Sequence, residues 1–176
     1  MKIHTIILLG FVFCLSLLFC TQCTTNKYQQ KFRNRALQAP SGIQALDARG
    51  KHKKNSETDP SDWQTAPDFS GLFEVTTPAH PNPVSYNAKF RILINVKAND
   101  AIKGLYIYAY QQPNELQSAQ PLKIFQQTLL PGFKSITLSP QQFAQGSGTS
   151  TIGNIYRIIF LDRQQRVITY GDVRVK

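Results

Sequence analysis

Side chains capable of nucleophilic chemistry are scarce after residue 60. All three cysteines, Cys14, Cys20 and Cys23, lie near the start of the chain, so the rest of the sequence offers no cysteine nucleophile. A serine nucleophile would depend on His80, the one histidine beyond residue 60. Because His80 stands in an Ala-His-Pro turn, we expect an exposed side chain rather than a general base.

Acid–base and metal chemistry would have to come from the carboxylates. Seven follow residue 60, and none is paired at a spacing typical of zinc or calcium ligands. We therefore expect no metal, no cofactor and no catalytic residue in this part of the chain. Two carboxylates from distant strands could still form a glycosidase-like pair, which leaves a small wall-polymer hydrolase as an alternative. The seven are Asp62, Asp68, Glu74, Asp100, Glu115, Asp162 and Asp172.

The cysteines belong to a leader with a different chemistry. Lys2 precedes an apolar run at residues 6–19, and small polar residues follow it, which is the pattern of a secretory signal. Residues 1–23 are therefore predicted to be a signal peptide, because the run is short for a membrane-spanning helix. Cys20 and Cys23 each end a stretch that resembles a bacterial lipoprotein signal, so either is a candidate for lipidation. Ordinary cleavage near Cys23 is the alternative.

The next segment, residues 24–62, has the composition of a disordered linker. It holds few large apolar residues, and between residues 24 and 60 eight Lys or Arg stand against three Asp or Glu. With so little apolar surface to bury, we expect a flexible tether. Its basic cluster predicts attraction to anionic lipid or acidic wall polymer, or else a solvated linker with no partner, and export argues against nucleic acid. The cluster is Arg49, Lys51, Lys53 and Lys54.

The remaining residues, 63–176, alternate in polarity and suffice for one domain. At residues 90–96 apolar side chains occupy every second position, which is typical of a strand with one buried face. Residues 155–161 are apolar on both faces, as in a central strand, and residues 162–165 predict a hairpin turn. We expect an all-β domain, an antiparallel sandwich of about seven to eight strands. The other predicted strands are residues 72–76, 105–110, 122–128, 134–138, 167–170 and 172–175.

Three tyrosines, Tyr106, Tyr108 and Tyr110, fall on one face of the strand predicted at residues 105–110. They could form a binding face for sugar rings or a partner protein, because aromatic side chains bury a large area at a small entropic cost. The alternative is structural: the tyrosines cover the outer face of a sheet or pack in a second layer with their hydroxyl groups at its rim. The predicted core is Phe73, Phe90, Ile92, Ile94, Leu105, Ile107, Ile136, Tyr156, Ile158, Phe160, Ile168 and Val173.

The order of the turns adds a family resemblance over residues 78–176. An Asn-Pro pair at residues 82–83 precedes one strand, a Pro-Gly pair at residues 131–132 precedes another, and Gly153 and Tyr156 open the last hairpin. This order resembles the immunoglobulin-like domains of flagellar hook-capping proteins and the C-terminal sorting domains of type IX secretion cargo. The resemblance implies a β-sandwich used for attachment or targeting, without an active site.

Together these features predict an exported cell-envelope protein, anchored by lipid, whose non-catalytic β-sandwich is a binding or accessory module. Its expected partners are the membrane, an anionic surface and an envelope protein. Two alternatives remain open. One is a secreted cargo protein whose sandwich is the sorting domain, and the other is the small hydrolase.

Overall fold

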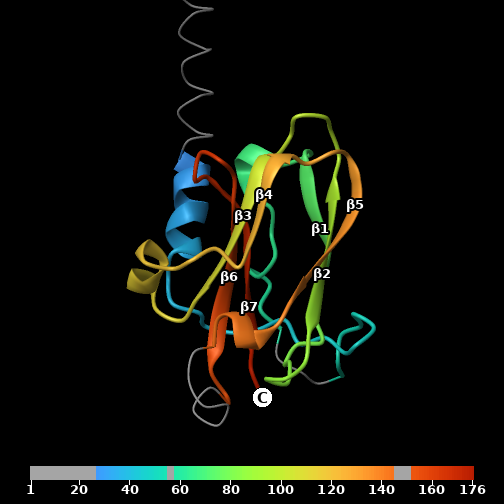
Figure 1. Cartoon of the computed structure of the whole chain (residues 1–176), viewed down its shortest axis with the longest axis vertical. Coiled ribbons are helices and arrows are strands. Elements are labelled where there is room, and N and C mark those ends of the chain that lie inside the picture. Colours follow the sequence, from blue (N-terminus) through green and yellow to red (C-terminus); the bar gives the residue numbers. More distant parts are fainter. Residues whose placement is uncertain (1–26, 55–57, 145–151) are drawn as a thin grey trace, which may run out of the picture.

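The computed structural model describes residues 27–54, 58–144 and 152–176, which build two antiparallel β-sheets stacked face to face (Figure 1). A helix at residues 27–36 lies on the outer side of one sheet. The three-stranded sheet has the order β1 (Phe73–His80), β2 (Phe90–Val96), β5 (Gly132–Leu138). The four-stranded sheet has the order β4 (Lys123–Thr128), β3 (Lys103–Tyr110), β6 (Ile155–Leu161), β7 (Val167–Arg174). Short 3-10 helices are η1 (Pro67–Phe69), η2 (Pro113–Gln117) and η3 (Pro140–Gln142).

The predicted β-sandwich is confirmed, and the alternation that predicted it accounts for the core. In β2, Phe90, Ile92 and Ile94 are fully buried, while Arg91 between them is exposed. Every side chain of the predicted core is buried. Burial of one large apolar side chain is worth roughly 1.5–3 kcal/mol, so these strands are held together chiefly by the core between the sheets.

The last two predicted strands form one continuous strand, β7, so the described part of the chain has seven strands. Gly171, which separates them in the sequence, lies within β7 and pairs with Ile158. A Cβ atom at residue 171 would come within 2.1 Å of the Trp63 ring. The glycine is therefore required by the close packing of Trp63 on the strand rather than by a turn.

The structure corrects the predicted flexible linker for the residues that it describes. Phe32 and Ala36 belong to the hydrophobic core cluster, and the Phe32 ring lies 5.2 Å from the Tyr170 ring. Ile43 and Leu46 are also fully buried. These apolar residues are few, but Phe32 and Ala36 lie one helical turn apart on the same face, so a small number covers the outer face of the sheet. The segment is part of the folded domain.

The two sides of the sandwich differ in how their edges are covered. The edge of β7 is closed by preceding segments: Trp63 N donates to Tyr170 O at 2.6 Å, and Val84 N donates to Arg174 O at 2.9 Å. Across the residues that the structure describes, no strand pairs with the outer edges of β4 and β5. An unpaired edge is open to further contacts.

The two ends of the sandwich also carry different segments (Figure 1). One end holds the start of the helix and the β2–β3, β4–β5 and β6–β7 connections, and we call it the helix-start end. Gln29 Nε2 donates to Val167 O at 3.3 Å, and Asp68 N donates to Gln29 Oε1 at 3.2 Å, which ties the helix start to β7. The opposite end, here the C-terminal end, holds the loop at residues 46–54, the β1–β2 connection and the C-terminus.

Candidate functional site

Arg157 is the centre of a buried polar cluster on the outer face of the four-stranded sheet. Its Nε and Nη2 donate to the two carboxylate oxygens of Asp172, at 2.8 and 2.9 Å. Its Nη1 donates to the carbonyl oxygens of Arg35 and Gln38, at 2.8 and 3.0 Å. These carbonyls belong to the end of the helix at residues 27–36 and to the residues after it, where the last helical turn leaves acceptors unpaired.

Further contacts close this cluster. The Tyr110 hydroxyl donates to the carbonyl oxygen of Ala36, and Ser41 N donates to Asp172 Oδ2 at 3.1 Å. The Arg157 guanidinium lies 4.7 Å from the centre of the Tyr170 ring. Because Arg157 is only 3% exposed, the cluster is a structural latch that binds the N-terminal segment to β6 and β7. We call it the Arg157 latch.

Asp62 lies buried beside the latch. It is 6% exposed, and among the described residues neither carboxylate oxygen has a hydrogen-bond partner. Burial raises the pKa of Asp62 to about 8, and the negative charge of Asp172 adds to the shift. Burial also raises the pKa of Tyr110 to about 12. The interior thus holds a carboxyl group that is largely protonated at neutral pH, which makes stability depend on pH.

His80 is buried, so the prediction of an exposed side chain is wrong. It is 5% exposed, and its Nδ1 donates to the carbonyl oxygen of Pro78 at 2.8 Å. The loop at residues 46–54 covers it, since a Cβ atom on Gly50 would lie 3.7 Å from the ring. The sequence around His80 predicted an exposed turn because the loop that covers the side chain is distant in the sequence. A carbonyl partner gives this histidine a structural role rather than that of a general base.

Several carboxylates after residue 60 serve ion pairs. Asp162 Oδ2 lies 2.7 Å from Arg166 Nη2, and Glu74 Oε2 lies 2.7 Å from Lys97 Nζ. Over the ranges that the structure describes, no three His, Cys, Asp or Glu side chains gather as metal ligands. The Lys97–Glu74 pair is exposed on both sides and is worth about 1 kcal/mol or less, whereas the Asp162 carboxylate is buried within the β6–β7 turn.

The lipidation candidates Cys20 and Cys23 lie outside the described residues, as does the predicted signal at residues 1–23. Of the helices that can be described, none is both long and apolar enough to cross a bilayer. Lipidation therefore stays a prediction from the sequence.

The basic cluster lies on an ordered hairpin at the C-terminal end. Leu46 bridges to His52, and Asp47 Oδ1 accepts hydrogen bonds from the backbone N–H groups of Arg49 and Lys51, at 2.8 and 2.9 Å. These hydrogen bonds lower the pKa of Asp47, and the bond from the Lys51 N–H contributes the most. The side chains that this turn brings together are exposed, and we call them the basic hairpin: Arg49, Lys51, Lys53 and Lys54.

The tyrosine stripe is covered within the chain. Tyr110 is buried, and Tyr106 and Tyr108 are partly buried, because the helix at residues 27–36 packs over this face of the sheet (Figure 1). The tyrosines thus form a second packed layer, with the Tyr110 hydroxyl bound to Ala36 at its rim. The structure places the possible binding face against the N-terminal segment, where Tyr110 is buried and Tyr106 and Tyr108 keep part of their surface exposed.

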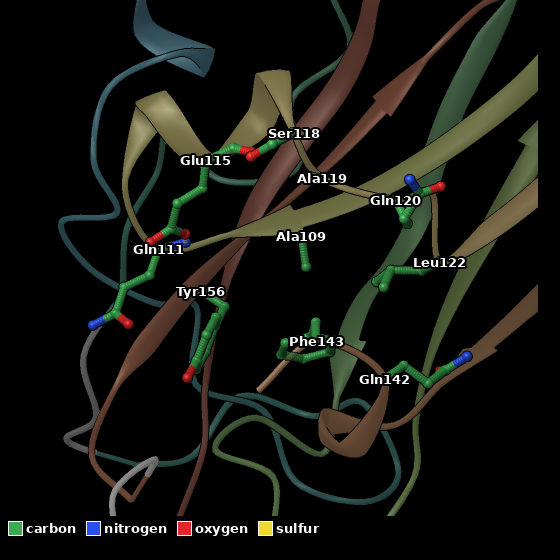
Figure 2. Close-up of a pocket in the computed structure, with 10 residues that line it drawn as sticks. All are labelled: Ala109, Gln111, Glu115, Ser118, Ala119, Gln120, Leu122, Gln142, Phe143 and Tyr156. Atoms are coloured by element: carbon green, nitrogen blue, oxygen red, sulfur yellow. Dashed lines mark hydrogen bonds between the residues drawn. The ribbon is translucent and has the colours of Figure 1, made fainter. Parts of the chain in front are cut away.

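A pocket of about 440 Å³ lies beside η2 and η3 (Figure 2). Its floor is apolar: the Phe143 ring lies 5.1 Å from the Tyr156 ring, and Ala109 and Leu122 also line the cavity. Sequence reasoning missed this site because its residues come from separate stretches without a shared motif. The polar and small residues of the rim are Gln111, Glu115, Ser118, Ala119, Gln120 and Gln142, and we call the site the glutamine-rimmed pocket.

Local hydrogen bonds orient part of this rim. Glu115 Oε2 accepts from the backbone N–H groups of Gln111 and Gln112, at 2.8 and 3.1 Å. Gln142 Oε1 accepts from Ser139 N at 2.8 Å. An apolar floor with a rim of three glutamine amides and one carboxylate suits a ligand that has both an apolar face and several hydroxyl groups.

Comparisons with known proteins give weak structural likenesses. No protein-family model matches the chain, and no curated protein matches it. The sensor domain of the anti-sigma factor RsgI4 from Pseudobacteroides cellulosolvens has a TM-score of 0.36 and 11% identity, covering 59% of this chain and 94% of that chain. A lytic polysaccharide monooxygenase from Jonesia denitrificans has a TM-score of 0.31 and 11% identity, covering 57% and 58%. A CARDB domain from Pyrococcus furiosus has a TM-score of 0.32 and 15% identity, covering 60% and 86%.

Proposed function

We propose that this chain is an exported, lipid-anchored protein of the cell envelope whose β-sandwich is a non-catalytic binding module. The anchoring part rests on the sequence, in which an apolar run at residues 6–19 leads to Cys20 and Cys23. The binding part rests on the glutamine-rimmed pocket, which is the observation that carries the proposal.

The sandwich is proposed to be immunoglobulin-like. Strands β1, β2 and β5 form one sheet, and β3, β6 and β7 lie in the other. An immunoglobulin sandwich divides its first, second and fifth strands from its third, sixth and seventh in the same way. Here the fourth strand joins β3 rather than the other sheet. Such sandwiches carry many functions, so the site and not the fold decides what this one binds.

The proposed ligand class is a neutral glycan of the envelope. A sugar ring places C–H groups against an aromatic floor and hydroxyl groups toward amide donors and acceptors. Among the described residues that line the pocket, Glu115 is the one carboxylate, and it is held by two backbone N–H groups. A glycosidase needs two carboxyl groups roughly 5–10 Å apart. This arrangement favours binding over hydrolysis.

Titration with neutral oligosaccharides prepared from envelope polysaccharide tests the binding proposal. Replacing an amide on the rim, Gln120→Ala, should raise the Kd about 3- to 10-fold, which is the effect of losing one hydrogen bond. Gln164→Ala, an exposed glutamine in the β6–β7 turn, is the matched control and should leave the Kd unchanged. Equal Kd values for wild type and Gln120→Ala would refute this use of the pocket. Release of shorter sugars in the same mixtures would instead support the hydrolase.

The mass of the intact mature protein tests the anchoring proposal. A diacyl or triacyl addition on Cys20 or Cys23 is expected. An unmodified N-terminus would instead support the alternative of a secreted cargo protein with a sorting domain.

A further inference from the structure

The β4–β5 connection and the start of β5 carry large apolar side chains that the rest of the domain leaves uncovered. Leu130 is 71% exposed and Phe133 is 76% exposed, and Pro131 between them is also exposed. Gly132 has a φ of +110°, a conformation that residues with a side chain rarely adopt, so the chain can turn sharply here. We call Leu130, Pro131 and Phe133 the apolar tip.

A shallow hollow continues this apolar surface along the outer edge of β4. Ile124, Leu129 and Leu130 are among the residues that line it, with Lys134 at its side. Ile124 is itself 45% exposed. Single exposed apolar residues are ordinary, but Leu130 and Phe133 are neighbours at a turn, and Ile124 lies farther along β4, whose outer edge pairs with no described strand. Removing them from water requires an apolar partner.

The apolar tip lies at the helix-start end. Gly132 pairs with Val96, the last residue of β2, and Leu129 N donates to Ile102 O at 3.0 Å. Both contacts set the tip beside the β2–β3 connection. The helix starts at the same end (Figure 1), so the preceding residues join the described domain on the side where the tip lies.

An acyl chain on Cys20 or Cys23 would keep the helix-start end of the domain close to the bilayer. Cys23 stands four positions and Cys20 seven positions before Lys27, so even an extended chain spans at most about 14 or 25 Å. The strands have seven or eight residues in most cases and span about 25 Å. The helix-start end is therefore the end that faces the membrane under the anchoring proposal.

The charge around the tip suits anionic head groups. Lys103 is exposed at the start of β3, Arg163 is exposed in the β6–β7 connection, and Lys134 follows the tip in β5. Basic side chains beside exposed apolar ones are typical of surfaces that bind membrane interfaces. The other charged residues of this end include Lys27, Lys31, Asp68 and Asp100, and the ion pairs Lys97–Glu74 and Arg166–Asp162.

We propose that the apolar tip inserts into the interface of the bilayer that holds the lipid anchor, so that the domain stands on its helix-start end. This inference rests on the anchoring proposed above. A single acyl chain binds a membrane only marginally, and Leu130 and Phe133 add a second apolar contact. In this orientation the basic hairpin at the C-terminal end points away from the bilayer. Its partner is then an acidic wall polymer rather than lipid of the same membrane.

Tryptophan fluorescence in vesicles tests this contact. The native Trp63 is 5% exposed, so it stays shielded from both lipid and solvent quenchers. Phe133→Trp puts a reporter at the tip. Ile152→Trp is the matched control, because Ile152 is 57% exposed and adjoins Gly153, whose N–H donates to Val175 O at the C-terminal end. Both full-length lipidated proteins are reconstituted into vesicles of zwitterionic and anionic lipid with brominated acyl chains.

Vesicle binding should shift the emission of the Phe133→Trp protein to the blue, and brominated lipid should lower that emission about twofold relative to lipid without bromine. The Ile152→Trp protein should show neither change. A Phe133→Trp protein that floats with the vesicles but is quenched only by aqueous acrylamide overturns the proposal. Protection from acrylamide without lipid quenching, growing with protein concentration, also overturns it, since a second copy then covers the tip. If mass spectrometry finds no lipid and brominated chains still quench, the anchoring fails and the tip contact stands.

Discussion

Replacing the buried Asp62 by asparagine should stabilise the domain at neutral pH. The substitution keeps the size of the side chain and puts a neutral amide in place of the carboxyl group. Among the described residues neither oxygen of Asp62 has a partner in good hydrogen-bond geometry, although the nearby backbone of Asp172 opposes part of the pKa shift. The main effect of the substitution is to remove a titratable group from the interior, near Asp172, Asp59 and Arg157.

The size of the effect follows from the pKa. Burial first, and then the charge of Asp172, raise the pKa of Asp62 from 3.8 to about 8. Because the folded state holds this proton more tightly than the unfolded state does, the stabilisation is complete below about pH 4 and is lost as the pH rises to about 8. Each pH unit in that window costs about 1.4 kcal/mol. At about pH 7 the carboxyl therefore lowers the free energy of unfolding by up to roughly 4 kcal/mol relative to acid.

Urea denaturation across a pH series measures this difference. The free energy of unfolding of Asp62→Asn, minus that of wild type, should grow by up to about 4 kcal/mol between about pH 5 and 8. The raised pKa of Asp172, caused by burial, is present in both proteins and largely cancels. Asp100→Asn is the control, because Asp100 is exposed and has a φ of 58°, which asparagine tolerates. Parallel curves for wild type and Asp62→Asn would refute the reasoning.

Three further substitutions test other parts of the structure. Gly171→Ala forces a methyl group into the tryptophan ring that packs on β7, so denaturation should show a loss of about 1–3 kcal/mol or more. Arg157→Leu leaves the buried Asp172 without its cation, which should cost about 3–5 kcal/mol and speed hydrogen exchange over residues 27–46. Replacing the basic hairpin by four glutamines should weaken binding to an acidic polymer, and the difference should shrink in high salt; equal binding would exclude this surface.

The sandwich could be predicted because its signal is local. In β2 and β3 every second residue is apolar, and the buried side chains Ile92, Ile94, Leu105 and Ile107 follow that alternation. The turn between β6 and β7 is equally local: Asp162 Oδ1 accepts from the backbone N–H groups two and four residues later, at 2.9 and 2.8 Å. Such contacts depend on neighbouring residues, which a single sequence displays.

The N-terminal segment and the pocket could not be predicted, because they depend on contacts between distant residues. Arg157 and Arg35 are separated by 122 positions, and nothing in either stretch marks them as partners. Composition wrongly predicted a flexible linker for residues 27–46, because the number of apolar residues does not show which surface they contact. Phe32 and Ala36 suffice, since the sheet face that they meet is already lined by Tyr170 and its neighbours.

Under the anchoring proposal, the Arg157 latch sets the orientation of the sandwich relative to the bilayer. Because Arg157 binds the end of the helix to β6 and β7, the helix start cannot turn independently of the domain. A free tether would let the domain rotate, and the apolar tip would then have no preferred partner. Adding Arg157→Leu to the Phe133→Trp protein should therefore reduce quenching by brominated lipid, although residue 157 lies near the other end of the helix. Unchanged quenching would mean that the tip reaches the bilayer without the latch.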